Sequence, residues 1–234
     1  MSLRFAAIVV AAGRGERFGR PKQLVEVAGR PLVAWSIALF GSLPELADLV
    51  IATEGEYFEA MHRLAETYAA RLTTAVVAGG ATRQASVRNA LAAVPERCDA
   101  VLVHDGARPL VRADDVRAGM AAVRPGAGAL LATPVVDTIK VVPRPGRTVA
   151  RTLERSELWA AQTPQFATLA DLRRAHETAL REGIEATDDA MLLERAGVEV
   201  SVVPSSGENL KVTLRGDRDL VEALLRERAL TVEK

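Results

Sequence analysis

A cluster of glycines and cationic side chains follows the first apolar segment of the chain. Residues 6–12 are all apolar, and residues 13–22 then carry three glycines and four cations. Glycine permits positive φ angles and close backbone approach, and guanidinium and ammonium groups bind phosphate oxygens. We therefore expect a polyphosphate at this loop, although a plain surface turn would carry similar glycines. The residues concerned are Gly13, Gly15, Gly19, Arg14, Arg17, Arg20 and Lys22.

The spacing of these glycines separates the loop from two common phosphate-binding motifs. The pattern Gly-x-Gly-x-x-x-Gly places its last glycine one position later than the dinucleotide fingerprint does. The loop also lacks the Gly-Lys-Ser/Thr ending of a P-loop. The sequence thus indicates a phosphate loop of another kind.

Two further loops carry residue types that suit a nucleotide. The segment 78–86 contains Gly79 and Gly80, which allow close approach of backbone groups to a planar base, and it leads into a helix. Thr82 and Ser86 in this segment suit either ligand binding or helix capping. A third loop, His104 to Pro109, holds an acid and a base three residues apart.

In that third loop, Asp105 could hold a metal ion and Arg108 a phosphate. The alternative is an ion pair that braces the turn. We assign no chemistry to His104, because a lone histidine at a strand end is more often a hydrogen-bonded structural residue.

Alternating apolar strands and amphipathic helices must position these loops. The pattern predicts an α/β fold of the Rossmann-like nucleotidyltransferase kind, with a mostly parallel sheet and helices on both faces. Ligands on such sheets bind outside the carboxyl ends of the strands. The three loops follow the first, third and fourth predicted strands, so we expect them to meet at one rim. Predicted strands cover 6–12, 48–53, 73–77, 99–104, 128–133 and 198–203, and predicted helices cover 32–40, 57–70, 87–93, 113–123, 169–182, 190–196 and 219–229.

The alternation breaks at residues 135–158. Two β-rich stretches, 135–142 and 148–153, flank a Pro143-Arg144-Pro145-Gly146 turn and predict a protruding hairpin arm. A two-stranded hairpin is marginal by itself, so we expect it to pack on a second subunit. Without a linker or a repeat, residues 1–234 are expected to form a single domain with this arm.

Composition narrows the classes of function. Thirty basic and thirty acidic side chains cancel, so no global charge favours nucleic acid or a membrane surface as a partner. A single cysteine, Cys98, and three scattered histidines exclude a disulfide framework and a cysteine-rich zinc site. No apolar run reaches the roughly 20 residues of a membrane helix, and no targeting segment precedes Arg4. We expect a cytoplasmic protein. Because no nucleophile with a paired base is evident, chemistry by positioning and charge stabilisation is favoured, as in nucleotidyl transfer.

Seven segments, taken in order, resemble the 2-C-methyl-D-erythritol 4-phosphate cytidylyltransferase family, and the resemblance spans nearly the whole chain. These segments are Ala11-Ala12-Gly13-x-Gly15-x-Arg17 with Pro21-Lys22-Gln23, Gly79-Gly80-x-x-Arg83-x-x-Ser86-Val87, His104-Asp105-x-Ala107-Arg108-Pro109, Asp137-Thr138-Ile139-Lys140, Gln162-Thr163-Pro164-Gln165, Thr187-Asp188 and Asn209-Leu210-Lys211-Val212-Thr213.

The resemblance implies transfer of CMP from CTP to methylerythritol phosphate, with release of pyrophosphate. Arg17 and Lys22 match the residues that stabilise the transition state, where charge builds on the α-phosphate. Asp105 matches the position beside the metal and the sugar phosphate, and the implied cofactor is Mg²⁺ or another divalent cation. The implied nucleotide-binding residues are Ala11, Ala12, Gly13, Gly15, Gly80, Arg83 and Ser86.

The resemblance also implies where the second substrate binds. Thr138 and Arg155 match residues that come from the arm of a partner subunit, which implies a homodimer with composite active sites. The complete set of implied substrate-binding residues is Asp105, Gly106, Arg108, Thr138, Arg155, Thr163, Thr187 and Lys211.

Three alternatives stay open. Ribitol 5-phosphate cytidylyltransferases share most of these motifs, and Arg155, Thr163 and Thr187 together favour methylerythritol phosphate. A nicotinamide-dependent oxidoreductase would need a tighter glycine fingerprint and an acidic residue near the end of the second strand; Glu54 is available, but Gly19 is misplaced. A nucleotide-binding module without activity would have no use for the catalytic-type cations.

Ala81 replaces a polar residue of many relatives beside the base, so backbone groups would contribute to base selectivity.

Overall fold

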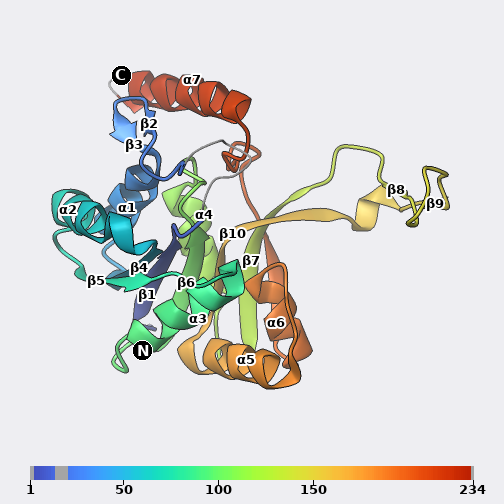
Figure 1. Ribbon diagram of the computed structural model, residues 1–234, viewed down its shortest axis with the longest axis horizontal. Helices are drawn as coiled ribbons and strands as arrows, with labels where there is room; N and C mark the ends of the chain where they lie inside the picture. The colour runs from blue at the N-terminus through green and yellow to red at the C-terminus, as the bar shows by residue number, and fades with distance from the viewer. Residues whose placement is uncertain (1–2, 14–20, 233–234) are drawn as a thin grey trace.

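A seven-stranded sheet forms the centre of the molecule in a computed structural model that describes residues 3–13 and 21–232 (Figure 1). The strand order is β11-β7-β10-β6-β1-β4-β5, and all neighbours are parallel except the two pairs that involve β10. The sheet confirms the predicted mostly parallel α/β fold. The strands are β1 (Phe5–Val10), β4 (Leu46–Thr53), β5 (Thr73–Ala78), β6 (Ala100–Asp105), β7 (Ala127–Pro134), β10 (Trp159–Thr168) and β11 (Glu199–Pro204).

Helices cover both faces of the sheet. On one face α1 (Leu32–Ser42), α2 (Phe58–Tyr68) and α4 (Ala113–Ala121) pack against residues such as Ala7 and Val9 of β1. On the other face α3 (Arg83–Ala93), α5 (Leu169–Glu182) and α6 (Asp189–Arg195) join the core that contains Ala6 and Ile8. Successive side chains of a strand point to opposite faces. The uninterrupted apolar sequence of β1 is therefore needed to supply both cores.

The strand β10 was not predicted, and it lies in the middle of the sheet between β6 and β7. It runs antiparallel to both neighbours, with Phe166 opposite Leu102 of β6 and Ala129 of β7. Its sequence contains Gln162, Thr163, Pro164 and Gln165, which do not give an apolar strand pattern. Hydrogen bonds to neighbouring elements compensate the burial of Gln162, Thr163 and Gln165.

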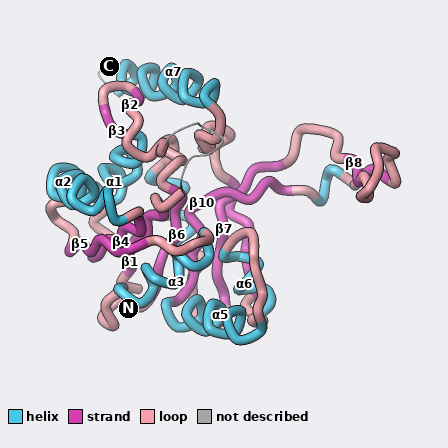
Figure 2. Tube along the Cα trace, viewed as in Figure 1, coloured by secondary structure: helices cyan, strands magenta, loops and turns pink. Residues whose placement is uncertain are grey.

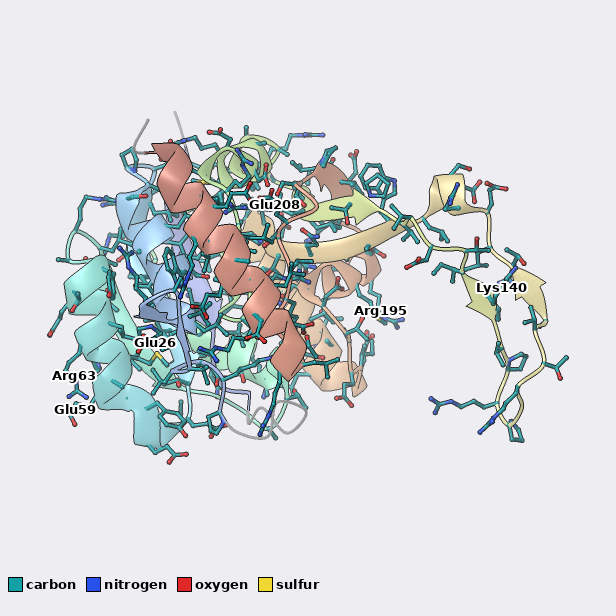
Figure 3. The ribbon with its side chains drawn as sticks, turned by 90° about the horizontal axis from the view of Figure 1, so that it is seen from above. Glu26, Glu59, Arg63, Lys140, Arg195 and Glu208 are labelled. Atoms are coloured by element: carbon teal, nitrogen blue, oxygen red, sulfur yellow. The ribbon has the colours of Figure 1, made fainter. Side chains whose placement is uncertain are left out.

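The segment 135–158 leaves the body between β7 and β10 and projects as an arm (Figures 1 and 2). Its two paired strands, β8 (Lys140–Val141) and β9 (Arg151–Thr152), are shorter than the stretches predicted for the hairpin, and the 3-10 turn η3 (Arg155–Glu157) follows them. Lys140 lies on the arm, well outside the body (Figure 3). Val136, on the same arm, is 80% exposed.

A smaller core lies beyond the main sheet. The hairpin of β2 (Glu26–Val27) and β3 (Arg30–Pro31) packs with the C-terminal helix α7 (Arg215–Val232), which begins four residues earlier than predicted. Val212 and Leu110 belong to this core, and the packing of Val212 fixes the backbone of the neighbouring residue Lys211. Residues 205–214, which include Lys211, form a loop. Another 3-10 turn is η2 (Gly55–Tyr57). Among the described residues, no helix is long and apolar enough to cross a membrane.

Candidate active site

A cavity of about 950 Å³ opens at the carboxyl ends of β1, β4, β5 and β6. The three loops singled out from the sequence all contribute to it, through Gly13, Gly80 and Asp105. This confirms that they meet at one rim of the sheet. The lining residues are Val10, Ala12, Gly13, Lys22, Gln23, Glu54, Gly79, Gly80, Ala81, Thr82, Arg83, Ser86, Asp105, Ala107, Lys211 and Thr213.

Two tightly packed glycines that follow β5 form part of the cavity lining. A Cβ atom at Gly79 would lie 2.1 Å from Cβ of Ala12, and one at Gly80 would lie 2.4 Å from Cβ of Ala85. The backbone N–H of Gly80 donates to Oγ of Ser86 at 3.0 Å. Thr82 caps α3 by accepting from the N–H of Ala85. Of the two residues that could have been caps, Thr82 is one, whereas Ser86 lies inside the helix and fixes the glycine loop.

Polar and charged side chains also line the cavity. Nζ of Lys22 donates to the carbonyl of Val212 at 2.6 Å, which ties the end of the first loop to the C-terminal loop. Nε2 of Gln23 donates to the carbonyl of Gly13 at 2.7 Å and braces the loop base. These contacts hold the ammonium group of Lys22 beside the part of the cavity that the first and third loops line.

Asp105 is the centre of an ion-pair network in the cavity. Its Oδ1 accepts from Nε of Arg83 at 3.0 Å, and its Oδ2 accepts from Nζ of Lys211 at 2.6 Å. Burial would raise the pKa of Asp105, but the charges of Arg83 and Lys211 outweigh it and hold the pKa well below its usual value. Asp105 is therefore an anion throughout the physiological range.

His104 takes no direct part in this network. Its ring is fully buried, with Nε2 3.1 Å from Oγ of Ser36 and Nδ1 3.2 Å from Oγ1 of Thr163. Burial lowers the pKa of His104 to about 4, so the ring is neutral near pH 7. Thr163 in turn accepts from the backbone N–H of Asp105 at 3.0 Å. His104 is thus the structural residue that the sequence indicated.

The cavity fits a divalent cation held by one protein carboxylate. Mg²⁺ commonly binds one or two carboxylates, with substrate phosphates and waters as its other ligands. Asp105 is ionised, and a carboxylate has about four lone-pair sites, so the two cations leave acceptor capacity. Among the described residues there is no group of three or more His, Cys, Asp and Glu side chains that could cage a metal. The donor set suits a metal brought with the nucleotide.

Several predicted residues lie close to the cavity without lining it. Ala11 is buried and donates its N–H to the carbonyl of Ala52. Gly106 is packed against Val9 and Val33. The Arg108 guanidinium donates to the carbonyl of Asn209 at 2.7 Å rather than to Asp105, so it does not brace the turn by the ion pair that the alternative supposed. Gly15 and Arg17 lie outside the described residues.

The remaining predicted substrate residues do not line the cavity of this chain. Thr138 and Arg155 are on the exposed arm, where Arg155 donates to the carbonyl of Val136. Thr187 is exposed just before α6, and Thr163 is buried beneath Asp105. Their assignment to substrate stays a prediction.

The sequence analysis assigned no role in this site to five residues that line the cavity: Val10, Gln23, Glu54, Ala107 and Thr213. Glu54 directly follows β4, where the rule for the carboxyl ends of parallel strands applies. Gln23 and Thr213 stand within recognised motifs but give no signal of their own.

Comparison with known proteins agrees with this geometry. The family model described as IspD, 2-C-methyl-D-erythritol 4-phosphate cytidylyltransferase, matches residues 5–227. The protein of that name from Thermosynechococcus vestitus is 40% identical over 223 residues, covering 94% of this chain and 95% of the relative.

Solved structures give the same result. The 2-C-methyl-D-erythritol 4-phosphate cytidylyltransferase from Thermus thermophilus is 35% identical, with a TM-score of 0.76, over 97% of this chain and 100% of that one. The 4-diphosphocytidyl-2C-methyl-D-erythritol synthase from Anaerococcus prevotii has a TM-score of 0.85 at 26% identity, over 96% and 99% of the two chains. The chain therefore belongs to the IspD family of 2-C-methyl-D-erythritol 4-phosphate cytidylyltransferases.

Proposed function

We propose that the cavity is the place where this cytidylyltransferase of the non-mevalonate isoprenoid pathway binds CTP and transfers CMP to 2-C-methyl-D-erythritol 4-phosphate. The observation that carries the proposal is the polarity of the cavity. Close-packed glycine backbone lines part of the cavity, and Lys22, Lys211 and Asp105 also line it. This combination suits a flat base against the glycine backbone and a triphosphate beside the charged side chains.

The transfer itself is an in-line displacement. A phosphate oxygen of methylerythritol phosphate attacks the α-phosphorus of CTP, the bond from that phosphorus to the bridging oxygen breaks, and pyrophosphate leaves with the bond's electron pair. Negative charge on the α-phosphate oxygens needs fixed positive charge nearby. Lys22 lies in the cavity for this role, and Arg17 is assigned the same role by the family resemblance.

Asp105 would hold Mg²⁺ against the phosphates. The bound ion supplies positive charge and orients the triphosphate. Arg83 and Lys211 keep the Asp105 carboxylate ionised and fixed in direction. Ser86 and Thr82 hold the glycine loop that faces the base.

A homodimer with composite sites is part of the proposal. Thr138 and Arg155 lie on the arm rather than at the cavity of their own chain (Figure 1). The arm exposes Val136, Ile139 and Val142, by 80%, 36% and 42%. A second copy that covers these apolar side chains would bring the arm's Thr138 and Arg155 to a partner's cavity. The single-domain organisation and the cytoplasmic location stay predictions from the sequence.

The test is pyrophosphate release with CTP and Mg²⁺, comparing methylerythritol phosphate with ribitol 5-phosphate. We expect release with methylerythritol phosphate and a loss of at least about 100-fold in kcat for Lys22→Ala, the size of effect found for a lost charge-stabilising donor. Arg63→Ala is the control, because the Arg63 guanidinium pairs with Glu59 on the exposed face of α2, away from the cavity (Figure 3).

Preference for ribitol 5-phosphate would overturn the substrate assignment. CTP binding without pyrophosphate release from either substrate would favour a nucleotide-binding module. Full activity of Lys22→Ala would refute the proposed role of this lysine.

A further inference from the structure

Arg83 is held between two carboxylates, of which only one lines the cavity. Its Nε donates to Oδ1 of Asp105 at 3.0 Å, and its Nη1 donates to Oδ2 of Asp189 at 2.7 Å. The Asp105 side chain, at the cavity, is 10% exposed, whereas the Asp189 side chain is 1% exposed and does not line the cavity. Arg83 therefore links a buried anion to the anion of the proposed active site.

Asp189 is itself fixed from several directions. It is the first residue of α6, and its backbone N–H donates to Oε1 of Gln165 in β10 at 2.9 Å. Its second carboxylate oxygen, Oδ1, lies 3.0 Å from Nε2 of the buried His176 in α5. Oδ2 is the oxygen directed to Arg83, so α5, α6 and β10 together determine where the guanidinium can lie.

The order of charges in this network alternates from the core to the cavity. Asp189 is followed by Arg83, then by Asp105, and finally by Lys211. Burial would raise the pKa of Asp189, but the charge of Arg83 outweighs it and keeps the pKa below its usual value. Arg83 and Asp105, the two interior charges, thus each have an opposite charge on both sides, which limits the ways in which Asp105 can turn.

We propose that Asp189 is a positioning residue for CMP transfer, which acts through Arg83 to hold the Asp105 carboxylate in its working direction. The inference rests on the proposed function of the cavity, because Asp189 touches neither substrate nor metal. On this proposal, the residues of α5 and α6 that fix Asp189 contribute to the reaction, because they hold the buried end of the ion-pair network.

The direct test is Asp189→Asn. The amide keeps the shape and one acceptor but removes the charge that holds the Arg83 guanidinium in place. We expect kcat/KM for CTP to fall by about tenfold or more, as for other residues that orient a ligating carboxylate. The matched control is Asp48→Asn. Asp48 is likewise 1% exposed and paired with an arginine, Arg97, but lies near the amino end of β4, away from the cavity.

A double-mutant cycle with Arg83→Gln separates positioning from stability. Arg83→Gln alone leaves Asp189 as a buried anion without its guanidinium partner, which is destabilising. If Asp189 acts through Arg83, adding Asp189→Asn to Arg83→Gln lowers kcat/KM by less than about twofold, and raises the melting temperature. Should Asp189→Asn alone not fold, this comparison of the single Arg83 variant with the double variant still tests the proposal.

Two results would overturn the inference: equal kcat/KM per folded molecule for Asp189→Asn and Asp48→Asn, or equal losses from Asp189→Asn in the presence and absence of Arg83. The first result would show that Asp189 contributes to stability alone, and the second would show that its effect on activity does not depend on Arg83. Failure of the proposed function is distinguishable, because the wild-type enzyme would then release no pyrophosphate.

Discussion

Replacement of Gly79 by alanine tests whether the glycine loop is needed for close packing at the part of the cavity where we propose that the base binds. The new Cβ would lie 2.1 Å from Cβ of Ala12 and 3.3 Å from Oγ of Ser86, where ordinary contact begins at 3.4 Å. Backbone must therefore move, because Cβ of Ala12 has no freedom of its own. Added atoms in a packed site typically cost about 1–3 kcal/mol, and we expect a loss of this size in the free energy of unfolding.

The same displacement should weaken nucleotide binding. Gly79 and Ala12 both line the cavity, so a shift of either loop changes the space that we propose for the base. If the strain energy were expressed entirely as weaker binding, a strain of about 1.4 kcal/mol would weaken CTP binding tenfold. Urea denaturation gives the stability term and titration calorimetry with CTP gives the binding term.

The double variant Ala12→Gly/Gly79→Ala provides the decisive comparison. It removes the nearest clash and leaves contacts of 3.3 Å to Ser86 and 3.6 Å to Cα of Ala12. We expect most of the lost stability and affinity to return, apart from about 0.5–1 kcal/mol for the added glycine. Gly55→Ala is the control, since no atom of the described residues lies within 4 Å of its Cβ position. The packing argument fails if Gly79→Ala behaves like Gly55→Ala, or if Ala12→Gly gives no recovery.

Two further predictions follow from the buried histidine and the arm. The pKa of His104 is about 4 in the folded protein, against an ordinary value of 6.5, so the unfolded chain takes up a proton first as the pH falls. Stability should therefore decrease by up to about 3 kcal/mol between pH 6.5 and pH 4, and His104→Asn should remove this part of the slope in urea titrations; an unchanged slope would contradict it. To test the composite site, we expect Arg155→Ala and Lys211→Met each to be inactive alone. When the two variants are mixed and refolded together, about a quarter of the wild-type activity should return, because half of the random dimers contain one intact site. No recovery of activity would argue against shared sites.

The sequence was sufficient to predict the layered α/β fold. The apolar run of β1 and the alternation of helices and strands report local propensity and burial, which depend on near neighbours in the chain. The rule that ligands bind at the carboxyl ends of parallel strands then placed three loops at one rim. The cavity lined by Gly13, Gly80 and Asp105 confirms that placement.

The insertion of β10 and the partners of Arg83 were decided only by the tertiary structure. Gln165 is stable in a central strand because its side-chain amide forms hydrogen bonds with Asp188 and with N–H groups of α6. The residues adjacent to Gln165 in the sequence do not predict these partners. Arg83 similarly meets Asp105 and Asp189, which are 22 and 106 residues away. The sequence determined which segments carry the chemistry, whereas the pairing of buried polar groups required the folded chain, because a polar side chain is stable inside only where distant partners satisfy it.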